Sequence, residues 1–122
     1  TTTVERIINF FPPEQHHLIY TQLSFLLKGV VSLRLLPRID QPGLIPAYEV
    51  MALSPTIASL IRENKLWEAP KYIATGDIYG MKSFNQCLFE LIEAKKIAAD
   101  VALDQSDKRE ELELQLRHKD LI

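Results

Sequence analysis

The sequence has one cysteine, few glycines and no long hydrophobic run, and each shortage excludes a class of protein. Cys87 is alone among 122 residues, so no disulfide can form within the chain and a reducing compartment such as the cytoplasm is expected. The apolar stretch from Leu23 to Leu27 ends at Lys28, far short of the roughly 20 residues that cross a bilayer. We therefore expect no transmembrane segment. The formal net charge of −2 offers no general attraction for nucleic acid or anionic lipid.

What is present has the proportions of an ordinary globular domain, with 47% hydrophobic and 25% charged residues. A chain of this length typically buries roughly two thirds of its extended-state surface, which predicts one domain with one hydrophobic core. The segment from Thr1 to Arg6 has neither the basic start nor the apolar centre of a secretion signal, and there is no initiator methionine. We expect a processed product or a piece of a longer protein.

Hydrophobic spacing predicts that most of the chain is helical. Ser54 followed by Pro55 is a typical helix start, and Ser83 with Gln86 three positions later matches a capping box. Gly76 is expected to end a short helix and to begin a turn that runs to Gly80. Helices are predicted at residues 4–11, from 13 or 14 to about 30, 56–64, 70–76, 83–92 and 97–103. In the second of these, the predicted apolar face is Ile19, Leu23, Leu26, Leu27 and Val30.

A β-hairpin interrupts the helices, which makes the predicted fold mainly α with a β-hairpin, an α+β class. Residues 31–36 are β-branched or alternate in polarity, and residues 44–51 form a second β-prone run. Between them, Asp40-Gln41-Pro42-Gly43 is the strongest turn signal in the sequence. Pro46 removes a donor from the second strand, so that end should lie at an edge or a bulge.

The last residues are ambiguous between strand and helix. Leu112, Leu114 and Leu116 alternate with polar residues as in a half-buried strand, although Leu, Glu and Gln all favour helix. We favour the strand. The polar residues 105–111 are expected to form a mobile connection before it.

The sequence contains no complete constellation for catalysis or metal binding. A phosphate-binding loop needs glycines followed by Lys-Ser or Lys-Thr, and none of the four glycines has that context. His16 and His17 are adjacent and so point apart on a helix, which is poor geometry for a shared metal, and His118 lies in a charged tail. Cys87 falls on an apolar stripe and is expected to be buried rather than nucleophilic. We expect no catalytic, cofactor or metal residue in this chain.

Glu49 is an unusual acid because it interrupts a β-prone run. It is either a charge on the solvent face of its strand or the partner of a cation across the hairpin, such as Arg34 or Arg38. The residue pattern alone thus indicates a helical domain with a hairpin and no self-contained active site. A free-standing helical protein-interaction module without ATPase activity remains compatible with it.

Several short segments together resemble the type IV pilus retraction ATPases, the PilT/PilU family. The resemblance covers nearly the whole chain, in order and at the expected separations. Its segments are Thr3–Pro12 (TVERIINFFP), Leu35–Arg38 (LLPR), Glu49–Met51, Ser54-Pro55, Leu60–Glu63 (LIRE), Gly80-Met81, Phe84–Gln86 and Leu88-Phe89.

In that family the matching region follows the Walker A and Walker B elements and a histidine-containing box. The resemblance therefore implies the C-terminal portion of a RecA-like P-loop ATPase domain, with ATP and Mg bound upstream of this chain. Residues 1–104 would be its helical and hairpin portion, and residues 105–122 a polar connection and C-terminal extension. The implied whole is a hexameric cytoplasmic motor for pilus retraction and twitching motility. It would bind no nucleic acid and would lie peripherally at the inner-membrane pilus machinery. The implied partners are identical subunits, a paralogous retraction ATPase and the pilus platform protein.

The family's retraction motif reads Ala-Ile-Arg-Asn-Leu-Ile-Arg-Glu, and this chain departs from it at Thr56, Ala58 and Ser59. Ala58 stands where the family has an arginine, so any polar contact made there is lost. Arg62 and Glu63 retain the motif and are our first choices for transmitting motion. The run from Asn9 to Pro12 and the extended tail are more similar to the PilU branch. The aligned motif is Thr56, Ile57, Ala58, Ser59, Leu60, Ile61, Arg62 and Glu63.

Overall fold

The computed structural model describes residues 2–122, which divide into two compact units. One unit contains the chain up to Val30 and the segment Val50–Met81, and the other contains Val31–Glu49 and Lys82–Ile122. Each unit has its own cluster of buried hydrophobic residues. The expectation of one hydrophobic core is therefore wrong, because the apolar residues are divided between two clusters.

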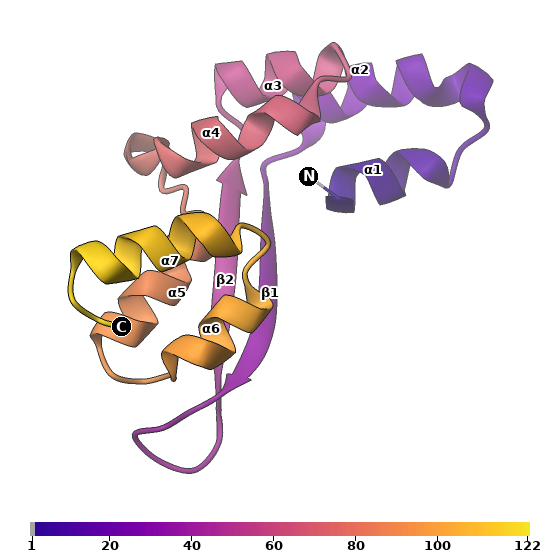
Figure 1. The fold of residues 1–122 in the computed structure, drawn as a ribbon. Helices are drawn as coiled ribbons and strands as arrows, with labels where there is room; N and C mark the ends of the chain where they lie inside the picture. Colours follow the sequence, from indigo (N-terminus) through magenta and orange to yellow (C-terminus); the bar gives the residue numbers. More distant parts are fainter. Residues whose placement is uncertain (1) are drawn as a thin grey trace. The chain divides into compact units, whose positions relative to one another are not determined.

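A two-stranded sheet contributes residues to both units. Strands β1 (Gly29–Pro37) and β2 (Leu44–Ala52) form the predicted antiparallel hairpin, drawn as the two arrows in Figure 1. At the predicted turn, Gly43 has a φ of 117°, and the Arg38 N–H donates to the Gly43 carbonyl at 3.0 Å. Glycine suits this position because it alone adopts such a backbone conformation without strain.

The first unit is built from helices that enclose one hydrophobic cluster. Its elements are α1 (Thr2–Asn9), η1 (Pro13–Gln15), α2 (His16–Leu26), α3 (Pro55–Arg62), η2 (Leu66–Glu68), α4 (Ala69–Ala74) and η3 (Asp77–Tyr79). Helices α2 and α3 lie side by side (Figure 1). The buried cluster is Val4, Ile8, Met51, Ile57, Leu60, Ile61, Leu66, Ala69, Ile73 and Met81.

Helix α3 begins and ends at local signals. The Ser54 hydroxyl accepts a hydrogen bond from the Ile57 N–H at 3.2 Å, which confirms the predicted Ser-Pro helix start. At the other end Asn64 has a φ of 56°, and the Lys65 N–H donates to the Leu60 carbonyl at 2.8 Å. A left-handed residue after the last turn is a common way to end a helix, and Asn tolerates it better than most residues.

The second unit packs three helices with the hairpin residues that belong to it. These are α5 (Phe84–Glu93), α6 (Ala99–Gln105) and α7 (Arg109–His118). The predicted capping box of α5 is confirmed, because Ser83 Oγ accepts from the Gln86 N–H at 3.1 Å and Gln86 Oε1 accepts from the Ser83 N–H at 2.8 Å. The buried cluster of this unit is Leu36, Ala47, Cys87, Leu88, Ile92, Ile97, Ala102, Leu103, Leu112 and Leu116.

The tail is a helix, α7, and the predicted strand is wrong. Leu112 and Leu116 are fully buried, whereas Leu114 is 61% exposed. A strand would place all three on one face, but a helix brings together residues four apart and turns the one between them outward. The polar connection is also shorter than predicted, because α7 already begins at Arg109.

Other boundaries differ from the predictions by a few residues. The strand β1 begins at Gly29 rather than near Val31, and α6 covers Ala99–Gln105 rather than 97–103. Leu26, predicted on the buried face of α2, is 71% exposed. Within residues 2–122, no helix combines the length and apolar character needed to cross a membrane.

Candidate functional site

The segment 56–63, aligned with the retraction motif, consists of helix α3 and the residue that follows it. Ile57, Leu60 and Ile61 point into the core of the first unit and are buried. Arg62 and Glu63 are exposed at the end of the helix. The segment therefore combines an apolar face that fixes its position with a charged end that faces solvent.

Arg62 lies beside an exposed aromatic ring from the neighbouring helix. Its guanidinium carbon is 5.7 Å from the centroid of the Phe25 ring, which is 67% exposed. A cation over an aromatic face at an exposed site contributes about 0.5–1 kcal/mol. Sequence reasoning missed Phe25, because the α2 pattern was interpreted only through its buried residues. Arg62 of α3 and Phe25 of α2 therefore form an exposed cation–aromatic pair at the end of the motif helix.

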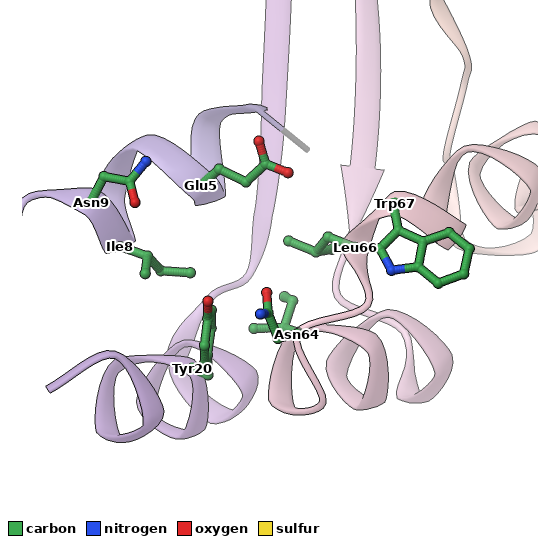
Figure 2. Close-up of a pocket in the computed structure, with 8 residues that line it drawn as sticks. Glu5, Ile8, Asn9, Tyr20, Asn64, Leu66 and Trp67 are labelled. Atoms are coloured by element: carbon green, nitrogen blue, oxygen red, sulfur yellow. The ribbon is translucent and has the colours of Figure 1, made fainter. Parts of the chain in front are cut away.

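A pocket of about 290 Å³ lies in the first unit, at the end of α3. Its lining comes from four elements: α1, α2, the end of α3 and η2 (Figure 2). The lining combines aliphatic side chains with amide, hydroxyl, carboxylate and indole groups. The residues are Glu5, Ile8, Asn9, Tyr20, Ile61, Asn64, Leu66 and Trp67.

The pocket carries one charged group, the carboxylate of Glu5. Glu5 and Asn9 are four residues apart on α1, a spacing that places both on one side of a helix. Trp67 is 73% exposed. Sequence reasoning identified none of these residues as functional; the i, i+4 polar pair on α1 and the lone tryptophan were the available signals.

The three predicted ion-pair residues have partners other than one another. Arg34 donates to the Gln105 carbonyl at 2.6 Å and lies 3.4 Å from an Asp107 oxygen, with its guanidinium 4.9 Å from the Phe84 ring centroid. Arg38 pairs with Asp40, and Glu49 Oε2 accepts from the Phe84 N–H at 3.3 Å.

Of the two alternatives for Glu49, pairing with Arg34 or Arg38 across the hairpin is therefore wrong. Phe84 is the first residue of α5, where backbone N–H groups lack partners within the helix and the helix dipole favours a negative charge. Glu49 accepts from this helix end, while Arg34 pairs with Asp107 and Arg38 pairs with Asp40.

The remaining candidates for chemistry are structural. Cys87 is buried, burial raises the pKa of its thiol, and its Sγ accepts from the Tyr48 N–H at 3.4 Å. A thiol whose pKa is raised carries less of the reactive thiolate. His16 Nε2 lies 2.8 Å from the Phe11 carbonyl oxygen. Within the part of the chain that the structure describes, no three His, Cys, Asp or Glu side chains form a group that could hold a metal ion.

Comparison with known proteins gives relatives over nearly the whole chain. The chain is 32% identical to the type IV pilus ATPase PilU of Pseudomonas aeruginosa over 114 residues. These residues are 93% of this chain and 30% of that protein. It is 31% identical to a twitching motility protein of Neisseria gonorrhoeae, over 90% of this chain and 29% of that protein. The retraction ATPase PilT of Pseudomonas aeruginosa is 32% identical over 85% of this chain and 30% of its own length.

The fold agrees with these sequence matches. A crystal structure of the pilus retraction motor PilT with bound ADP superposes with a TM-score of 0.80 at 34% identity, covering 93% of this chain and 31% of that one. No family model matches the chain. The chain spans about 30% of the length of the curated relatives it matches.

Proposed function

Because the chain belongs to the PilT/PilU family of pilus retraction ATPases and corresponds to a C-terminal part of its members, we propose that it is a segment of a motor for type IV pilus retraction and twitching motility. The observation that carries this proposal is the match to PilT in both fold and sequence, with a TM-score of 0.80 at 34% identity. ATP and Mg would bind in a part of the motor outside this chain. In this proposal the chain packs subunits and transmits motion.

The motif helix α3 is our candidate for transmitting motion. Its buried face couples it to the first unit, so a displacement of the helix would move the unit with it. Its exposed end presents Arg62, with Phe25 beside it, to a neighbouring part of the motor. Ala58, which replaces the family's arginine, is half-buried and offers no polar group, so Arg62 carries the contact.

One face of the hairpin is our candidate for packing against another part of the motor. Val31, Leu33 and Leu35 alternate along β1 and so share one face of the strand, with exposed fractions of 66%, 59% and 58%. Fully burying such a side chain contributes about 1.5–3 kcal/mol. Since the chain spans about 30% of its relatives, a large part of a full-length relative is available to cover this face.

We extend the proposal to the assembly in which the motor works. A homo-hexamer, a paralogous retraction ATPase and the pilus platform protein are the proposed partners, in the cytoplasm at the inner-membrane pilus machinery. Of the two named branches, we favour the PilU-like one. The run from Asn9 to Pro12 and the extended tail, which are more similar to that branch, support this choice.

The experiment is an Arg62→Ala substitution in the full-length protein, with ATP hydrolysis measured on the purified protein and twitching measured in cells. We expect hydrolysis to remain within about twofold of the unmodified protein, because the nucleotide site lies elsewhere, and twitching to be lost. The matched control is Arg117→Ala. Arg117 is also an exposed arginine near the end of a helix, paired with Glu113 at 2.8 Å, and its loss should leave both readouts unchanged.

The two readouts separate the parts of the proposal. Normal twitching with Arg62→Ala would contradict the transmitting role of α3. Failure of the unmodified full-length protein to hydrolyse ATP would contradict the motor itself.

A further inference from the structure

We propose that the pocket at the end of α3 binds an arginine side chain presented by a partner protein. This inference concerns a site that the motor proposal does not use, and it does not rest on that proposal. The pocket brings a carboxylate, a hydroxyl and an amide from three different elements to one cavity: Glu5 from α1, Tyr20 from α2 and Asn64 after α3.

The arrangement of these groups suits several hydrogen-bond donors at once. Figure 2 shows the Glu5 carboxylate, the Tyr20 hydroxyl and the Asn64 amide around the same space, with Ile8 and Leu66 beside them. Carboxylate, hydroxyl and amide oxygens all accept hydrogen bonds, and a guanidinium has five N–H donors and no acceptor. The aliphatic part of an arginine side chain would then contact the apolar residues.

Charge selects a cation. Glu5 is the only charged residue in the lining, and among the described residues it forms no ion pair. A phosphate or carboxylate ligand would be repelled by this group, whereas a guanidinium forms a charge-assisted hydrogen bond with it.

The set of acceptors favours arginine over lysine. Trp67 also lines the pocket and is 73% exposed, but Figure 2 shows its indole beyond Leu66, directed away from Glu5 and Tyr20. A guanidinium has five N–H donors in a planar fork and binds carboxylates with two of them, while an ammonium is a compact and strongly hydrated charge.

The volume accommodates one side chain. Pockets for drug-sized ligands measure about 300–1,000 Å³, and this one, at about 290 Å³, is at the lower end of that range. A single arginine side chain would fit inside it, with its backbone remaining outside on the partner.

The test is a titration of the ¹⁵N-labelled full chain with N-acetyl-arginine amide, followed by NMR. We expect saturable shifts of the Glu5 and Asn64 amide signals and of the Trp67 indole N–H, with a dissociation constant of about 1–10 mM, as befits a ligand of few atoms. The uncharged isostere N-acetyl-citrulline amide should cause no saturable shift at the same concentrations, and N-acetyl-lysine amide should bind more weakly.

Two variants make the result specific. Glu5→Gln removes the charge from an exposed side chain without changing its size, and should weaken arginine binding about tenfold. Glu14→Gln, in η1 and outside the lining, is the matched control and should leave binding unchanged. The spectrum of each free variant shows whether it is folded.

Three results would overturn the proposal. The first is equal binding of the arginine and citrulline derivatives, and the second is unchanged arginine binding by folded Glu5→Gln. The third is self-association of the chain that Glu5→Gln abolishes, because the occupant would then be a second copy rather than a separate partner.

Discussion

At the turn of the hairpin, Arg38 and Asp40 form a two-point ion pair, with N–O distances of 2.8 and 2.6 Å. The hydrogen bonds from the guanidinium lower the pKa of Asp40 from 3.8 to about 2. Partial burial raises the pKa of Asp40, but the hydrogen bonds from Arg38 outweigh this effect. Sequence reasoning offered Arg38 only as one possible partner of Glu49, because a cross-strand rule overlooks a carboxylate two residues along the chain.

The pair predicts a pH dependence at the level of one residue. Since the folded pKa of Asp40 lies below its ordinary value, its stabilising effect is fully present above pH 3.8 and is lost as the pH falls towards about 2. An NMR titration of the Asp40 carboxyl should give a midpoint near 2, and Arg38→Gln should return the midpoint towards 3.8. An unchanged midpoint in Arg38→Gln would show that another group causes the shift.

Gly76 illustrates how a correct residue prediction can have a different cause. The helix α4 does end just before it, as expected. However, its φ is −95°, which any residue adopts, and a Cβ there would lie 2.9 Å from both the Met81 side chain and the Tyr72 carbonyl oxygen. Close packing requires the glycine at this position, and a sequence alone does not show which residues approach one another.

At the scale of elements, contacts between residues close in the sequence could be predicted, whereas contacts between residues far apart could not. The Ser54-Pro55 start and the capping box at Ser83 were predictable because their hydrogen bonds join residues three apart. The role of Glu49 was not predictable, since the N–H that donates to its carboxylate belongs to Phe84, 35 residues away. The pocket was missed for the same reason: its lining comes from four separate elements.

The helix α7 was mispredicted because alternation over five residues does not distinguish helix from strand. Leu112 and Leu116 satisfy both periods, and only Leu114 differs between them. The helix follows from packing, because its buried leucines complete the cluster of the second unit.

Substitutions on α7 test this assignment. Leu112→Ala should destabilise the chain by about 2–5 kcal/mol, because it leaves a cavity in the core, as measured by urea unfolding. Leu114→Ala, the matched control, should change the free energy of unfolding by less than about 0.5 kcal/mol, because that side chain is exposed. If both substitutions lowered the free energy of unfolding by similar amounts, the tail would be a strand rather than a helix.

At the scale of the whole molecule, composition and length predicted a hydrophobic core but not its division into two clusters. The chain has two hydrophobic clusters, and residues from both sides of the hairpin turn take part in each unit. The family, by contrast, was predictable from several short segments in order, and 93% of the chain matches the PilT structure. The absence of a phosphate-binding loop is consistent with a chain that covers about 30% of its relatives.

The central claim is that this chain is part of a nucleotide-driven retraction motor, and its gene provides the most direct measurement. Sequencing the DNA upstream of the codon for Thr1 should reveal, in the same reading frame, a Gly-x-x-x-x-Gly-Lys-Ser/Thr segment, the phosphate-binding loop that a motor requires. A start codon immediately before Thr1, with no such segment, would contradict the claim and favour a free-standing interaction module.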